Sequence, residues 1–346
     1  MQYEITQVGP LLDENGNLTQ IGWSRQPLLD CNLEKVNFYS ALKKPFQRFR
    51  VKRWDYYAVF TPMRFFSATI ADLGYAGNIF VYTLDFESNQ LYEDGLIIPL
   101  GKGIQLPHNS IEGDTIFESK KAQLLFQVQR GLRSITVEWP GFQKGKGIHA
   151  DLKFYCPQEH ESMTIVIPIE EKRFYYNRKI NCMPVEGTIQ YGDQSEELEP
   201  TTSIGSLDWG RGVWAYSSFW NWASASGFLP DGRTIGLNIG CGFGDNSAAS
   251  EDCMILDGRV HKFGAVKFEY DRGDYYKPWK FTDQEGRCSL EFTPFQERLA
   301  ETDLKIITSE VHQMFGRYSG TVITDDGETI VIKDLIGFAE EHQARW

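Results

Sequence analysis

The chain has 346 residues, 41% hydrophobic and 14% aromatic, which suffices for one large β-rich unit or two domains. Its 35 basic and 47 acidic side chains give a formal charge of −12, which disfavours nucleic acids and anionic membranes as partners. The 32 glycines and 14 prolines are spread along the chain, which excludes collagen-like and low-complexity structure.

The first segment, MQYEITQVGPLLDENGN, is polar and acidic and lacks the apolar centre of a signal peptide. No run approaches the ~20 apolar residues of a membrane-spanning helix. None of the six cysteines stands in a CxxC pair or in a His/Cys cluster with zinc spacing. We therefore expect a cytoplasmic protein with free, buried thiols and no integral membrane segment.

Only two stretches are compatible with helices, residues 31–44 and the tail 337–346. Between them, RFRVKRWD at 48–55 is the one basic stretch, and it alternates charged and apolar residues. This alternation predicts a strand with one face in water. A phosphate-binding patch is the alternative, which the acidic composition of the chain disfavours.

Strands dominate the rest of the chain. Runs rich in β-branched and aromatic residues are separated by turn sequences such as PDGR and DDGE, a spacing typical of a sandwich or barrel. The runs lie at 54–62, 64–73, 78–86, 122–131, 133–141, 147–155, 162–170, 213–224, 233–242, 252–258, 259–271, 277–283, 287–295, 304–316, 318–327 and 328–335. The polar segment 190–206 resembles a linker and divides the chain into an N-terminal domain, residues 1–200, and a C-terminal domain, residues 201–346.

The stretch LDWGRGVWAYSSFWNWASASG, residues 207–227, carries four of the nine tryptophans. With a strand period of two, the predicted strand 213–224 has one nearly all-aromatic face. That face holds Trp214, Tyr216, Trp220 and Trp222. Such a face fits either the packed core of a barrel or the wall of a pocket for an apolar ligand.

Asp208 stands directly before Trp209 in this apolar setting. Burial raises the pKa of a carboxyl group, so Asp208 is a candidate acid that stays neutral near pH 7. A neutral acid can protonate a carbon–carbon double bond, and indole faces can shield the cation that forms. The alternative is that Asp208 caps a turn through its side-chain oxygen.

Two further residues are candidates for the chemistry. Glu251 follows the polar loop GDNSAAS at the mouth of a predicted hairpin, where it could act as a base, orient water or be a hydrated loop acid. His261 lies in RVHKFGAV, and a lone histidine without a partner is more often structural.

In the first half, KRWDYY places Trp54 and Tyr56 on one strand face. These rings either close a pocket against the second half or seal the interface between the domains. His149 and Asp151 form an i, i+2 pair without a third ligand, so no metal site is expected.

Common catalytic and nucleotide-binding motifs are absent from the sequence. It contains no GxSxG, HExxH or P-loop pattern. GCGFG at 240–244 follows a hairpin strand and opens no evident helix, which excludes a Rossmann site. No cofactor is expected.

Several stretches together resemble one family. They are GWSRQPLLDCN (22–32), KRWDYY (52–57), ATIADLGYAG (68–77), residues 207–227, DGRTIGLNIGCGFG (231–244) and HQMFGRYSGTV…LIGFAEEHQARW (312–346). Over nearly its whole length, the chain resembles the bacterial family catalogued as domain of unknown function 2804. That family is similar to tandem lipocalin-like proteins, which include carotenoid hydratases, tocopherol cyclases and lipocalin-type Diels–Alderases. Their Asp-His-X-Trp-Gly landmark corresponds here to Asp208, Trp209 and Gly210, without the histidine and one residue shorter.

The resemblance implies an all-β fold of two tandem lipocalin-like antiparallel β-barrels or half-open barrels with few short helices. It also implies acid-assisted chemistry on an apolar, alkene-bearing molecule. We therefore expect cofactor-free hydration, isomerisation or cyclisation of a hydrophobic, isoprenoid-like small molecule, with Asp208 as the acid and Glu251 or His261 as its helper. The expected pocket residues are Trp54, Tyr56, Trp209, Trp214, Tyr216, Trp220 and Trp222. A non-catalytic carrier or sensor of a hydrophobic small molecule is the alternative.

Overall fold

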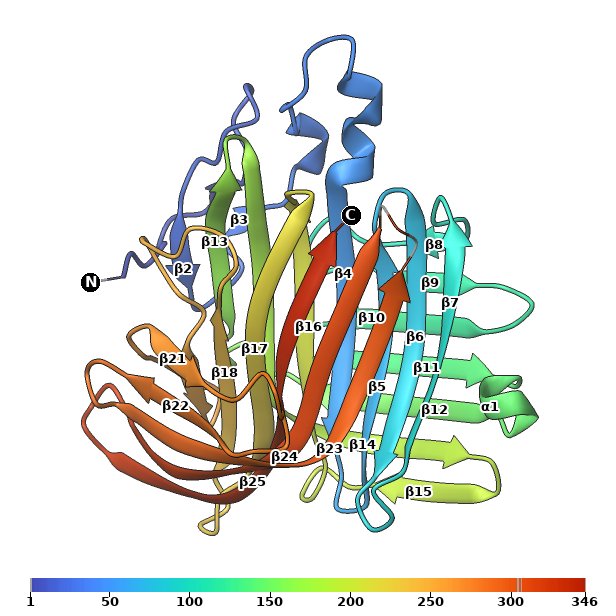
Figure 1. Ribbon diagram of the computed structural model, residues 1–346, viewed down its shortest axis with the longest axis vertical. Coiled ribbons are helices and arrows are strands. Elements are labelled where there is room, and N and C mark those ends of the chain that lie inside the picture. The colour runs from blue at the N-terminus through green and yellow to red at the C-terminus, as the bar shows by residue number, and fades with distance from the viewer. Residues whose placement is uncertain (1, 304, 306, 346) are drawn as a thin grey trace.

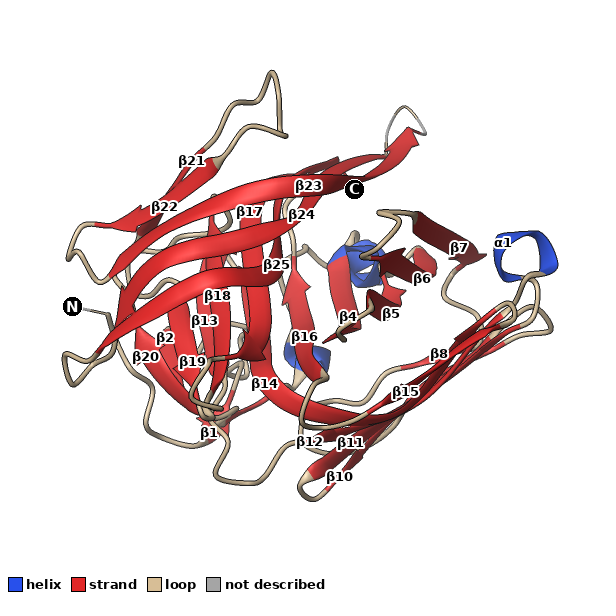
Figure 2. Cartoon of the chain, turned by 90° about the horizontal axis from the view of Figure 1, so that it is seen from below, coloured by secondary structure: helices blue, strands red, loops and turns tan. Residues whose placement is uncertain are grey.

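The computed structural model describes residues 2–303, 305 and 307–345. Figure 1 shows two large sheets side by side, and Figure 2 shows that both are curled. Within the described residues, the helices are the short η1 (Leu33–Lys35), η2 (Lys44–Arg50) and α1 (Phe142–Gly145), and none of them is long and apolar enough to cross a membrane. The predicted all-β fold of two half-open antiparallel barrels with few helices is confirmed.

The first large sheet contains 14 strands among the described residues. They are β2 (Gly22–Ser24), β4 (Val51–Phe60), β5 (Arg64–Asp72), β6 (Ala76–Asp85), β7 (Leu91–Pro99), β8 (Ile104–Gln105), β9 (Thr115–Glu118), β10 (Gln123–Gln129), β11 (Leu132–Trp139), β12 (Ile148–Tyr155), β13 (Met163–Glu170), β14 (Arg173–Tyr191), β15 (Gln194–Leu198) and β16 (Ile204–Val213). The main order is β7-β6-β5-β4-β16-β14-β12-β11-β10-β9-β8, with β13 and β15 attached to β14 and β2 attached to β13. The short β1 (Gly9–Pro10) and β3 (Leu29–Asp30) pair separately and in parallel.

The long strand β14 folds this sheet onto itself. Its first part pairs with β13 and β16, and its last part pairs with β12 and β15. The pairing with β16 shifts register between Ile180 and Met183, where Cys182 has a positive φ of 63°. Side chains fill the space between the two layers, for example Tyr57 against Phe126 with ring centroids 5.1 Å apart. The folded first sheet, called the first unit below, therefore encloses a packed core.

The second large sheet contains nine strands among the described residues. They are β17 (Ser217–Phe228), β18 (Thr234–Cys241), β19 (Cys253–Leu256), β20 (Arg259–Lys262), β21 (Val266–Glu269), β22 (Trp279–Asp283), β23 (Cys288–Asp303), β24 (Thr308–Ile323) and β25 (Thr329–Arg345). Their order is β20-β19-β18-β17-β25-β24-β23-β22-β21. Figure 2 shows that the long strands β23, β24 and β25 are curved. The second sheet has a core of its own, which includes Trp279, Phe281 and Phe292.

A third apolar cluster joins the two sheets. Phe65 of β5 contacts Phe315 of β24 and Phe338 of β25, with ring centroids 4.8 and 6.2 Å apart. The strands β4, β5 and β6 are thus buried on both faces, since they also contribute to the first core. Burial on both faces explains their nearly continuous apolar sequences.

The tryptophan-rich stretch belongs to both sheets. The predicted single strand 213–224 is wrong, because β16 ends at Val213 and β17 begins at Ser217. Trp214 and Tyr216 lie in the connection and do not share a strand face with Trp220. The chain therefore changes sheet after Val213, whereas the predicted domain division falls between residues 200 and 201.

The basic stretch 48–55 and the tail also differ from expectation. The stretch begins in η2, and Lys52 of β4 is only 1% exposed, because its Nζ donates hydrogen bonds to the carbonyls of Phe49 and Leu73 at 3.2 and 2.6 Å. The prediction of one regular face in water is wrong at Lys52. The tail forms the end of β25 and no helix, as far as Arg345. Residues 304 and 306 of the predicted strand 304–316, and residue 346 of the tail, lie outside the described residues.

Candidate functional site

Strand β16 presents two chemically different faces. Trp209 belongs to the core of the first unit, where its ring meets Tyr176 edge-on at 5.3 Å and lies 4.4 Å from the Arg211 guanidinium. Asp208 points the other way, toward the second sheet, because side chains alternate along a strand. The residue lies inside β16, so the alternative of a turn-capping aspartate is wrong. Trp209, which was predicted to line the pocket, lies on the opposite face.

Lys179 of β14 joins carboxylates from both sheets. Its Nζ lies 2.8 Å from Asp208 Oδ2 and 3.8 Å from Glu251 Oε2. The same ammonium group lies 3.9 Å from the centroid of the Trp222 ring. Asn177 donates a hydrogen bond to Asp208 Oδ1 at 2.6 Å, so both oxygens of Asp208 have a partner. The structure therefore brings Asp208 and Glu251 to the same ammonium group.

Glu251 lies two residues before the start of β19 and is held by β18. Asn238 donates from Nδ2 to the Glu251 carbonyl at 2.9 Å and to Oε2 at 3.2 Å, and its Oδ1 accepts from Trp222 Nε1 at 2.8 Å. A Cβ atom at Gly240 would overlap the Glu251 carboxyl group. Gly240, the first glycine of GCGFG, therefore provides room for the Glu251 side chain and not for a nucleotide.

β25 supplies a third carboxyl group that sequence analysis did not select. Glu340 is the cross-strand partner of Trp222, so the two side chains project from the same face. Its Oε1 accepts from Trp220 Nε1 at 3.2 Å, and its Oε2 accepts from Gln313 Nε2 at 3.1 Å. Burial raises the pKa of Glu340 to about 7, although the Trp220 hydrogen bond opposes the rise. The assignment of 337–346 as helix-compatible hid the strand alternation that would have placed Glu340 beside Trp222.

A chain of hydrogen bonds continues from Glu340 into the first sheet. Gln313 Oε1 accepts from Tyr82 OH at 2.9 Å, and the hydroxyls of Tyr82 and Tyr56 lie 2.8 Å apart. Burial raises the pKa of Tyr82 to about 12, so its hydroxyl stays protonated at neutral pH. The Tyr56 ring also meets Trp222 edge-on at 5.9 Å. Tyr56 therefore packs at the interface between the sheets, against Trp222.

An aromatic cluster of Trp54, Tyr175, Trp214, Trp220 and Phe243 lies beside these carboxyl groups. The Trp214 ring is 5.3 Å from Trp54, 5.4 Å from Trp220 and 4.4 Å from Phe243. A Cβ at Gly210 would overlap the Trp54 ring, so this glycine lets the ring lie against β16. Burial raises the pKa of Tyr175 well above its ordinary value, and the charges of Glu251 and Asp208 add to the rise. Trp54, Trp220 and Phe243 remain half-buried, so their rings are partly open to solvent.

A family model described as domain of unknown function DUF2804 matches residues 2–346. The chain belongs to the DUF2804 family. The resemblance drawn from the sequence is therefore confirmed for the family.

Two solved structures are similar to this DUF2804 chain. One, from Nitrosomonas europaea and assigned as an AttH, shares 13% identity at a TM-score of 0.47, covering 88% of this chain and 97% of its own. The other, kievitone hydratase from Nectria haematococca, shares 11% identity at a TM-score of 0.47, covering 85% of this chain and 88% of its own. Comparison with curated proteins gives no match.

Two predicted residues of the DUF2804 chain lie apart from this site. His261 Nδ1 accepts from the backbone N–H of Asp325 at 3.1 Å and lies 3.7 Å from the Asp325 carboxylate. Tyr216 is 43% exposed, and the Arg50 guanidinium lies 5.4 Å from its ring. The structure therefore does not bring His261 or Tyr216 to Lys179.

The structure also shows the surroundings of His149 and a cavity between the sheets of the DUF2804 chain. His149 pairs with Glu138 at 2.7 Å. Within residues 2–303, 305 and 307–345, no group of three or more His, Cys, Asp and Glu side chains is arranged to hold a metal ion. A cavity of about 240 Å³ lies between the sheets, with Phe60, Ile204, Phe228 and Ile336 in its wall. Neither Asp208 nor the tryptophans of the site line that cavity.

Proposed function

We propose that this protein performs cofactor-free acid–base chemistry on a hydrophobic, isoprenoid-like small molecule held between its two sheets. The reaction is a hydration, an isomerisation or a cyclisation. The observation that carries this proposal is that carboxyl groups with different neighbours lie around one indole ring. Asp208 and Glu251 share the Lys179 ammonium group, whereas Glu340 accepts hydrogen bonds from uncharged side chains. Trp222 lies against the Lys179 ammonium of the Asp208–Glu251 cluster and is also the cross-strand partner of Glu340.

Glu340 is the proposed proton donor. A pKa of about 7 leaves its carboxyl group substantially protonated at neutral pH and gives it a good driving force for proton transfer. This role moves from Asp208, which the sequence favoured, because Asp208 Oδ2 forms an ion pair with Lys179, whereas the Glu340 oxygens accept hydrogen bonds from the uncharged side chains of Trp220 and Gln313. Asp208 instead positions Lys179 between the sheets.

Glu251 is the proposed base. Its side chain is 16% exposed, against 11% for Asp208, and its Oε2 lies farther from Lys179 than Asp208 does. Asn238 and Lys179 hold its carboxyl group at the interface, with the Asn238 amide 3.2 Å and the Lys179 ammonium 3.8 Å from Oε2. Paired carboxyl groups in different protonation states are the arrangement that acid–base catalysis needs.

In a hydration, Glu340 transfers its proton to one alkene carbon, and the cation on the other carbon faces the indole rings of Trp220 and Trp222. A water oxygen bonds to that carbon, and Glu251 accepts the proton that the water loses. One water molecule is added, and proton exchange with solvent returns Glu340 and Glu251 to their starting states. In an isomerisation, Glu251 instead removes a proton from the carbon next to the cation.

The test is incubation of the purified protein in heavy water with apolar small molecules extracted from cells that produce it. Mass spectrometry then detects deuterium on carbon or an added D₂O. We expect incorporation by the unchanged protein, its loss in Glu340→Gln and Glu251→Gln, and its retention in His261→Gln. A ligand that co-purifies and returns without deuterium would contradict the proposal and support the carrier alternative.

A further inference from the structure

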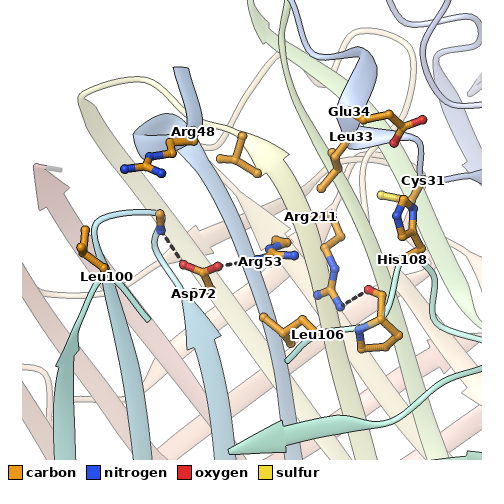
Figure 3. Close-up of a pocket in the computed structure, with 13 residues that line it drawn as sticks. Cys31, Leu33, Glu34, Arg48, Arg53, Asp72, Leu100, Leu106, His108 and Arg211 are labelled. Atoms are coloured by element: carbon orange, nitrogen blue, oxygen red, sulfur yellow. Dashed lines mark hydrogen bonds and ion pairs between the residues drawn. The ribbon is translucent and has the colours of Figure 1, made fainter. Parts of the chain in front are cut away.

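A cavity of about 460 Å³ opens beside η1 and the start of β4, and Asp208 is not among the residues that line it (Figure 3). Its wall combines Leu33 of η1, Val51 and Arg53 at the start of β4, and Leu100 and Leu106 on either side of β8. Arg211, on the face of β16 opposite Asp208, also lines it. This volume is in the range of small-molecule sites.

Basic side chains gather in this cavity although the whole chain carries a charge of −12. Arg48, Arg53, His108 and Arg211 line it, and Arg48 forms no ion pair with any described residue. Two acids, Asp72 and Glu34, also line the cavity. Asp72 is already occupied, because Arg53 lies 2.5 Å from its Oδ2 and the Gly74 N–H donates to its Oδ1 at 2.8 Å. Figure 3 shows Glu34 beside Leu33, away from Arg48. In Figure 3, Arg53 lies between Asp72 and Arg211, with Arg48 above Asp72.

Arg211 leaves a donor group without a partner in the cavity wall. Its guanidinium is fully buried and binds Asp55 at 2.9 Å and the Pro107 carbonyl at 3.2 Å. Its Nε–H has no hydrogen-bond partner among the residues that the structure describes. A buried donor without a partner is costly, so it marks a place where a bound acceptor is favoured.

The apolar part of the wall defines the rest of the ligand. Leu100 at the rim is 66% exposed, and Leu33 and Leu106 are partly exposed. An apolar ligand that covered these side chains would remove their surface from water. A purely polar anion such as inorganic phosphate would leave them in contact with water.

We propose that this cavity binds an amphiphile with an anionic head group. The head group lies against Arg48 and Arg53, and the apolar body covers Leu33, Leu100 and Leu106. This explains the basic stretch 48–55, for which an anion-binding role was the less favoured alternative. The site is distinct from that of Glu340 and does not depend on any reaction there.

Fluorescence of anilinonaphthalene sulfonate, itself an anionic apolar compound, measures binding to the full chain. Dodecanoate, dodecanol and inorganic phosphate then compete for the same probe. We expect dodecanoate to displace the probe at least about tenfold more effectively than dodecanol, because a charge-assisted contact is lost in the alcohol. Phosphate should not displace it, and higher salt should weaken binding of the probe.

The variants assign the binding to this cavity. Arg48→Gln should weaken binding of the probe about fivefold, and Arg48→Gln/Arg53→Gln should weaken it further. Leu106→Trp fills the cavity without changing its charge and should also weaken binding. Arg259→Gln removes one exposed positive charge on β20 and is the matched control, which should leave binding unchanged.

Three results would overturn the inference. Equal displacement by dodecanol and dodecanoate would show that the site does not distinguish a charged head group from an uncharged one. Displacement by phosphate alone would show that the apolar wall is not used. Equal binding by the unchanged chain and the Arg48→Gln/Arg53→Gln variant would place the probe elsewhere, and Trp222→Ala would then test the site between the sheets.

Discussion

Lys179 and Asp208 are direct neighbours across the pairing of β14 with β16, and Lys179 Nζ lies 2.8 Å from Asp208 Oδ2. Glu251 from the second sheet approaches the same ammonium group at 3.8 Å. The cluster is therefore complete only when the two sheets are packed together. Its position at the interface links the stability of the fold to the geometry of the site.

Replacement of Lys179 by methionine should expose this dependence. Lys179→Met keeps the apolar stem but leaves two carboxylates without their shared cation, so it should lower the free energy of unfolding by about 3 kcal/mol. Lys179→Met/Asp208→Asn should recover part of that loss, because one of the two charges is removed. Urea denaturation of both single variants and the double variant measures the coupling. Strictly additive losses would contradict the ion-pair account.

Glu340 should make stability depend on pH in a specific window. The folded chain holds its proton up to a pKa of about 7, whereas the unfolded chain releases it near the ordinary value of 4.5. The contribution of Glu340 to the free energy of unfolding therefore falls as pH rises through this window, by at most about 3 kcal/mol. Glu340→Gln cannot lose a proton, so its stability relative to the unchanged chain should rise across the window and level off above pH 7. A difference that stays flat between pH 5 and pH 8 would count against a raised pKa.

Gly240 should be required for the position of Glu251. Gly240→Ala places a methyl group against the Glu251 carboxyl and should cost about 1–3 kcal/mol of stability. Gly141→Ala is the matched control, because a Cβ there meets nothing within 4 Å. When Glu251 is also replaced by alanine, Gly240→Ala should lower the free energy of unfolding by less, since the carboxyl group that the new methyl group would overlap is gone. Thermal unfolding of these variants checks the result, and an equal cost in both backgrounds would place the strain elsewhere.

The apolar contact between the sheets should make them unfold together. Phe65→Ala removes a fully buried ring that contacts Phe315 and Phe338, and it should cost about 3–5 kcal/mol. Phe46→Ala changes a ring that is 60% exposed and should cost little.

Denaturation followed by circular dichroism and by tryptophan fluorescence should give coincident transitions in the unchanged chain. Separate transitions would show that the sheets are independent.

Residue types and periodicity predicted the all-β architecture, because strand runs and hairpin turns are local signals. They also selected Asp208, Glu251, Trp220 and Trp222. They did not separate β16 from β17, since Trp214 and Tyr216 continue the aromatic pattern through a connection between two sheets.

Glu340 was missed for a different reason. A glutamate in a charged tail has no local sign of burial. Its environment comes from Trp220 on β17 and Gln313 on β24, which only the folded sheet brings to it. The same limit applies to His261, whose partner Asp325 is distant in sequence.

The most direct test of the proposed acid–base site is a titration of the Glu340 carboxyl group by NMR. Glutamate labelled with ¹³C at the side-chain carboxyl gives the signals, and Glu340→Gln identifies the one that belongs to Glu340. We predict a midpoint near pH 7 in the folded protein, in line with its pKa of about 7. A midpoint near the ordinary value of 4.5 would leave Glu340 ionised at neutral pH, without a proton to donate, and would contradict the proposed mechanism.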